Sequence, residues 1–173
     1  MGKLHVLAKF SQDLHLETIE HDGIIMEHKS GEGGGKHLIR DIWDSQLDEI
    51  GEQRGLQTIV GEMIDTFKKL YAISIDNYRI EHRVYILDDE KFVGRIHDDS
   101  CEYSLVLYYR IDKDVRGGRL NFYDDDAKNI VDFHDPQVGD LVILDGVHAV
   151  GELYAISKKS VRSIIIVHIN SEE

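Results

Sequence analysis

The hydrophobic residues of this chain follow two different periods, one in each half of the sequence. The clearest helical pattern is LQTIVGEMIDTFKKLYA, residues 56–72, in which apolar side chains recur three and four positions apart. Residues 39–50 show a similar spacing and predict a second helix. The apolar positions are Ile39, Ile42, Trp43, Leu47 and Ile50 in the first segment and Leu56, Ile59, Val60, Met63, Ile64, Phe67, Leu70 and Tyr71 in the second. We expect the 56–72 stripe to pack on a sheet of the same domain rather than on a partner.

From about residue 78 the period changes to two, which is typical of strands. Turn-forming residues separate eight candidate strands, at 79–87, 93–97, 103–111, 118–123, 129–134, 140–145, 147–152 and 160–169. An opening apolar stretch around Leu4 is a further candidate strand, and GEGGGK at 31–36 predicts a loop. Eight short strands with close turns predict a sandwich or barrel. We therefore expect one domain over residues 1–173, mainly β with α, in which a helical buttress (1–77) supports a β core (78–170).

The composition limits the kinds of molecule that the protein is expected to bind. The chain is 42% hydrophobic and 31% charged, and it contains no apolar run long enough to cross a bilayer. Its net charge of −13 argues against the backbone of a nucleic acid as the main partner. Cys101 is the only cysteine, so no intrachain disulfide forms, and a cytoplasmic location is expected.

The stretch RIHDDSCEYSLVLYYRI, residues 95–111, places polar residues at the start of an apolar strand. Alternation along a strand puts His97 and Asp99 on one face and Asp98 on the other. His148, in LVILDGVHAV, has the parity of the inward-facing apolar residues before it. Two imidazoles and one carboxylate on neighbouring strands are the ligand set of non-haem Fe(II) oxygenases. Each residue also has a plainer interpretation: a hydrogen-bonded core histidine or a strand-end carboxylate.

Arg162 begins the apolar strand VRSIIIVHI and shares a face with Ile164, Ile166 and His168. A buried guanidinium requires an anion, which is either a bound dicarboxylate or one of the chain's own acidic residues. Cys101 is expected to be a small strand residue, with a position beside a metal as the alternative.

Taken in order, these motifs resemble the Fe(II)/2-oxoglutarate-dependent dioxygenases, and within them the prolyl 4-hydroxylase-like superfamily. The resemblance covers roughly residues 78–170 and rests on His97-x-Asp99, LVLYYRI, GGRL, PQVGDL, His148 and Arg162-Ser163-Ile164. It implies a double-stranded β-helix, or jelly-roll, barrel buttressed by N-terminal helices.

The resemblance also implies roles for individual residues. His97, Asp99 and His148 would bind Fe(II), and Arg162 would bind the distal carboxylate of 2-oxoglutarate, supported by the hydroxyls of Tyr109 and Tyr85. The implied reaction uses O2, with ascorbate as a reductant, and hydroxylates an unactivated C–H bond with release of succinate and CO2.

Some features depart from that family pattern. Arg162 follows His148 by 14 residues, a longer gap than usual, so Lys158 is an alternative carboxylate ligand. His168 stands where prolyl hydroxylases often have tryptophan, which weakens the case for a peptidyl proline as substrate. An amino-acid side chain in a protein or peptide, a free amino acid and a small metabolite all remain open. So do two other functions for the chain: a catalytically silent binding module of the same fold, and a cupin-type enzyme with another metal.

Overall fold

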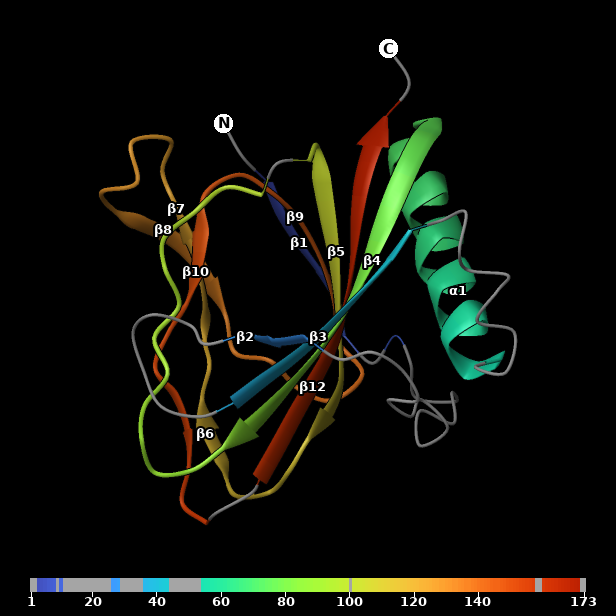
Figure 1. Cartoon of the computed structure of the whole chain (residues 1–173). Coiled ribbons are helices and arrows are strands. Elements are labelled where there is room, and N and C mark those ends of the chain that lie inside the picture. The colour runs from blue at the N-terminus through green and yellow to red at the C-terminus, as the bar shows by residue number, and fades with distance from the viewer. Residues whose placement is uncertain are drawn as a thin grey trace.

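The computed structural model describes residues 3–8, 10, 26–28, 36–43, 54–99, 101–157 and 160–171. Its largest element is a seven-stranded antiparallel sheet with the order β1-β9-β5-β12-β4-β3-β2. The strands of this sheet are β1 (Lys3–Leu7), β2 (Met26–His28), β3 (Lys36–Trp43), β4 (Ile75–Leu87), β5 (Tyr103–Ile111), β9 (Leu141–Asp145) and β12 (Ser160–Ser171). The two longest, β4 and β12, pair over nearly their whole length and form its centre (Figure 1).

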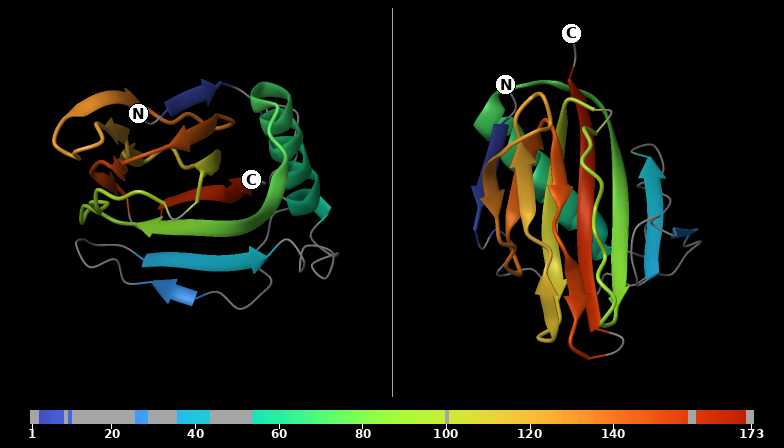
Figure 2. Two further views of the ribbon diagram at one scale, coloured as in Figure 1. Left: turned by 90° about the horizontal axis from the view of Figure 1, so that it is seen from above. Right: turned by 90° about the vertical axis from the view of Figure 1, so that its left-hand side faces the viewer.

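Two smaller sheets face the large one. They are β10-β7-β8 and β11-β6, built from β6 (Val115–Gly117), β7 (Leu120–Tyr123), β8 (Ile130–His134), β10 (His148–Val150) and β11 (Leu153–Ala155). Single β-bridges, Phe92 to Leu153 and His97 to His148, attach the segment between β4 and β5 to this layer. The two layers and their connections are seen from two further directions in Figure 2.

Helix α1 (Arg54–Tyr71) lies on the face of the large sheet opposite the small sheets (Figure 1). From Ile59 to Phe67 its apolar stripe is buried against the sheet, as predicted, and Phe67 is fully buried. Leu70 differs, with 46% of its surface exposed. The helix ends at Tyr71, and the next residue, Ala72, has a positive φ of 51° that turns the chain while its N–H still bonds to the carbonyl of Lys68.

Two hydrophobic clusters divide at the large sheet. One joins α1 to one face of the sheet, and the other fills the space between the large sheet and the small ones. Strand β12 contributes alternate residues to each: Ile165 and Val167 face the helix, whereas Ile164 and Ile166 face inward. The predicted alternation of this strand is therefore confirmed.

The predicted fold class, mainly β with α, is confirmed, although α1 is the only one of the expected N-terminal helices found among the described residues, and three local predictions were wrong. Residues 36–43 form strand β3, not the start of a helix, because they pair with β4 at eight successive positions. Tertiary pairing of this kind outweighs the weak helical preference of a short segment. Residues 93–97 form a connection with single bridges instead of a strand, and 147–152 divides between β10 and the approach to β11. The remainder of the predicted 39–50 helix, and the 31–35 part of the loop, lie outside the described residues.

Candidate metal centre

The bridge between His97 and His148 creates the centre of the site. The two backbones exchange N–H···O bonds of 3.0 and 2.9 Å, which sets the imidazole centroids 4.5 Å apart. Asp99 follows two residues after His97 and places its carboxylate beside both rings. One potential ligand atom from each residue lies within 4.8 Å of the others. The structure thus brings together the three residues that the sequence singled out.

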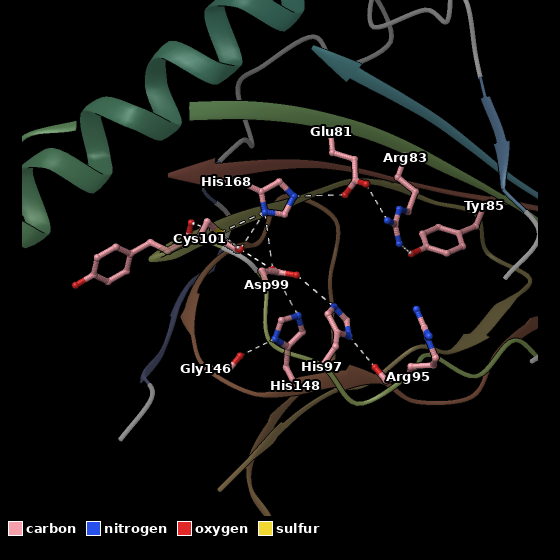
Figure 3. A network of polar contacts seen from close by, with 12 residues as sticks. Glu81, Arg83, Tyr85, Arg95, His97, Asp99, Cys101, Gly146, His148 and His168 are labelled. Atoms are coloured by element: carbon pink, nitrogen blue, oxygen red, sulfur yellow. Dashed lines mark hydrogen bonds and ion pairs between the residues drawn. The ribbon is translucent and has the colours of Figure 1, made fainter. Parts of the chain in front are cut away.

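Backbone carbonyls orient both imidazoles. The Nδ1 of His97 lies 2.7 Å from the carbonyl oxygen of Arg95, and the Nδ1 of His148 lies 2.9 Å from that of Gly146. Because a carbonyl only accepts, each Nδ1 carries a proton. Nε2 of His97 therefore donates to Asp99 while the ring is protonated, and each Nε2 presents its lone pair when its ring is neutral. These Nε2 atoms lie 3.3 and 3.7 Å from the Asp99 carboxylate oxygens (Figure 3). Such outer hydrogen bonds are the usual means of orienting a metal-binding histidine.

Asp99 remains an anion in this setting. Burial raises the pKa of its carboxyl, but hydrogen bonds from His97 and Ser104 and the nearby His148 and His168 rings lower it well below the usual range. The Ser104 hydroxyl donates to Oδ2 at 2.6 Å. In turn the hydrogen bond to Asp99 raises the pKa of His97, while burial lowers that of His148. Two nitrogen donors and one ionised oxygen donor therefore fit a divalent transition metal, and the open side of the triad leaves room for further ligands.

A charged row on the inner face of β4 lies next to the triad (Figure 3). Arg83 donates to Glu81 at 2.9 Å and to the Tyr85 hydroxyl at 3.2 Å. The Nε2 of His168 lies 3.6 Å from the other Glu81 oxygen. Burial would raise the pKa of Glu81, but the contacts with His168 and Arg83 lower it to about 2. The sequence had singled out only Tyr85 on this strand, although Glu81 and Arg83 share its parity and could have been found from it.

Arg162 lies deeper on the same inner face, where only 2% of its surface is exposed. Its guanidinium stands over the rings of Tyr85 and Tyr108, with centroids at 5.5 and 5.0 Å. Nη1 donates to the carbonyl of Gly118 at 3.2 Å, and the buried Nε has no hydrogen-bond partner among the described residues. No carboxylate of the described part of the chain pairs with it. Lys158, the alternative from the sequence, lies outside the described residues.

Tyr109 does not reach Arg162, contrary to the prediction. Its side chain lies on the helix-covered face of β5, in the cluster that contains α1, and its hydroxyl bonds to the imidazole of His82. Tyr108, one residue earlier, points inward and takes the place expected for Tyr109. Tyr85 does lie beside Arg162, as expected.

A cavity of about 390 Å³ opens beside Asp99 and His168. Its lining residues carry polar side chains and include Asn77, Arg79, Asp98 and Asn170. Asp98 was expected to face away from the site. Strand alternation does not apply to it, however, because residues 93–99 form no strand, and the side chain lines this cavity instead.

No helix of the described part of the chain is both long enough and apolar enough to cross a membrane.

Comparison with known proteins gives similarity at the level of structure. No protein-family model and no curated protein matches the chain. Solved structures do match it. A protein of the 2OG-Fe(II) oxygenase family from Burkholderia pseudomallei superimposes with a TM-score of 0.61 and 14% identity, over 84% of this chain and 72% of that one.

Two further solved structures have a similar fold. An IDO from Bacillus thuringiensis matches with a TM-score of 0.57 and 19% identity over 75% of this chain, which spans only 60% of that protein. A bsmA homolog from Methylobium petroleophilum PM1 matches with a TM-score of 0.56 and 15% identity, over 85% of this chain and 76% of that one. The expected resemblance is thereby confirmed in the fold: this chain has the double-stranded β-helix architecture of the 2OG-Fe(II) oxygenases.

Proposed function

We propose that the protein is an Fe(II)- and 2-oxoglutarate-dependent oxygenase that hydroxylates an unactivated C–H bond. The observation that carries this proposal is the triad, in which His97, Asp99 and His148 converge with both Nδ1 atoms already held by carbonyls. A metal bound by these three residues keeps its remaining positions open for a co-substrate and dioxygen. Fe(II), 2-oxoglutarate and O2 together supply the oxidant for hydroxylation, with succinate and CO2 as the other products, and ascorbate would keep the iron reduced.

The chain's own contribution is to hold the reactants in position. Arg162 is the best-suited group for the distal carboxylate of 2-oxoglutarate, because its buried charge has no carboxylate partner among the described residues. Arg83 is less suited, since Glu81 already balances its charge. The rings of Tyr85 and Tyr108 fix the Arg162 guanidinium from the inner face of the sheet. Ser104 and the two carbonyls keep the three ligands in one orientation.

The polar cavity beside Asp99 supports a proposal for the class of substrate. Its lining carries both charges, from Arg79 and Asp98, and two amides, from Asn77 and Asn170. A polar amino acid, free or as a side chain in a peptide, or a small polar metabolite suits this lining better than an apolar ring. A peptidyl proline fits least well, because His168 and not an aromatic apolar side chain lies at the site.

The test is an anaerobic titration of metal-free protein with Fe(II) and then 2-oxoglutarate. Formation of the chelate is followed by its visible charge-transfer band. We expect the band in the wild type and its loss in His97→Ala. Arg162→Met should need roughly 10- to 100-fold more 2-oxoglutarate, as expected for removal of a hydrogen bond to a charged group.

Two matched controls sharpen the result. Arg83→Met removes an inner-face arginine whose charge is already balanced, and it should shift the 2-oxoglutarate requirement much less than Arg162→Met. Lys158→Met tests the other cation that the sequence offers. A folded wild type that forms no band contradicts the proposal. Metal binding without any response to 2-oxoglutarate would instead indicate a metalloprotein of the cupin type.

A further inference from the structure

A second group of potential ligands lies on the other side of Asp99, away from His97 and His148. It consists of Asp99, Cys101 and His168, whose ligand atoms lie within 4.8 Å of one another. Cys101 comes from the connection before β5, and His168 from the inner face of β12. The Ser104 hydroxyl holds the group together, since it lies 3.3 Å from both Sγ of Cys101 and Nδ1 of His168 while donating to Asp99. Asp99, Cys101 and His168 are seen together in Figure 3.

The spacing of these atoms suits a thiolate-binding metal. Sγ of Cys101 lies 3.5 Å from Nδ1 of His168. A tetrahedral zinc ion with ordinary Zn–S and Zn–N bonds separates its sulfur and nitrogen ligands by about 3.6 Å. Nδ1 lies 3.9 Å from Oδ2 of Asp99, so a small movement of the carboxylate would complete three ligands around one ion. The adjoining cavity leaves space for a water as the fourth ligand.

His168 has the surroundings of a metal ligand. Only 9% of its side chain is exposed, and Nδ1 points at Cys101 and Asp99. Its other nitrogen, Nε2, makes no hydrogen bond among the described residues but faces a Glu81 oxygen at 3.6 Å. A carboxylate behind the second nitrogen is the arrangement that orients metal-binding histidines. Arg83 in turn fixes that carboxylate.

We infer that Asp99, Cys101 and His168 form a second metal site, selective for a thiophilic divalent cation such as Zn²⁺. Sulfur, nitrogen and a single oxygen are the donors that zinc accepts in protein sites, whereas the His97 side of Asp99 offers only nitrogen and oxygen. Because Asp99 belongs to both groups, an ion in one site draws on a ligand of the other. Zinc in the second site therefore opposes metal binding at the first.

Cobalt(II) is the probe for this site, because a thiolate bound to Co(II) gives an intense near-ultraviolet charge-transfer band. Cys101 is the chain's only cysteine, so such a band can come from no other residue. We expect the band in the wild-type protein and in His97→Ala, which lacks a ligand of the first site only. It should be absent in Cys101→Ser and Asp99→Ala. His168→Gln should weaken Co(II) binding at least 10-fold, and one equivalent of Zn²⁺ should remove the band.

The result does not depend on the proposed oxygenase activity, because neither 2-oxoglutarate nor turnover enters the measurement. Circular dichroism and urea unfolding establish that each variant is folded. His97→Ala is the matched control, since it removes a neighbour of Asp99 but none of the three ligands, and it should keep the band. A folded wild type without the band overturns the inference, and so does a band of unchanged affinity in His168→Gln.

Discussion

The substitution Gly118→Ala tests whether the buried guanidinium of Arg162 is held as the structure describes. Gly118 has a φ of +79°, and a Cβ built on it would lie 2.0 Å from Nη1 of Arg162 and 2.9 Å from Cδ1 of Leu153. An alanine here is strained by its backbone and must also displace the guanidinium. The displacement breaks the bond from Nη1 to the Gly118 carbonyl.

The expected cost of Gly118→Ala follows from these two effects. A left-handed backbone conformation costs an alanine about 1–2 kcal/mol. A hydrogen bond from a charged group contributes about 1.5–3 kcal/mol. Together they lower the free energy of unfolding by about 2.5–5 kcal/mol, a large fraction of the stability of an ordinary domain.

Urea unfolding followed by circular dichroism measures this cost, and a double-mutant cycle separates its parts. In an Arg162→Met background the Nη1 atom is gone, so Gly118→Ala should cost only about 1–2 kcal/mol. Gly61→Ala is the control: it lies on the exposed side of α1 with nothing within 4 Å of its Cβ, and it should stabilise by about 0.5–1 kcal/mol. Equal costs of Gly118→Ala in the two backgrounds would refute the contact with Arg162.

Two further predictions concern the core and the pH dependence of stability. Phe67→Ala should cost about 3–5 kcal/mol in the same assay, because the ring is fully buried and stacks on Tyr71, whereas Leu70→Ala, at a half-exposed position of the same helix, should cost under about 1 kcal/mol. Burial raises the pKa of Tyr108 to about 12, so its neutral form stabilises the fold fully below pH 10, the ordinary value, and this contribution is lost as the pH rises toward 12. Between pH 9 and pH 11 the free energy of unfolding should therefore fall by roughly 1 kcal/mol less in Tyr108→Phe than in the wild type. An equal fall in the two proteins would contradict the buried position of the hydroxyl.

The parts of the fold that the sequence predicted are those with a one-sided environment. Helix α1 has one apolar face and one polar face, and its 3.6-residue period predicted both its extent and its packing. Strand β3 lacked such a signal. Its residues acquire their conformation from pairing with β4, which begins more than thirty positions later, and no local pattern reports that pairing.

The wrong prediction that Tyr109, and not Tyr108, lies beside Arg162 has the same kind of cause. Six consecutive residues of β5, from Ser104 to Tyr109, are buried, because the helix covers one face of the strand and the small sheets cover the other. A strand buried on both faces shows no alternation, so its sequence cannot indicate which parity faces the site. The inner face can be identified only from a residue whose role does not depend on this pattern, and Asp99 is such a residue. The hydroxyl that bonds to its carboxylate belongs to Ser104, so Ser104 faces the site. Tyr108 shares the parity of Ser104 and therefore faces the same way.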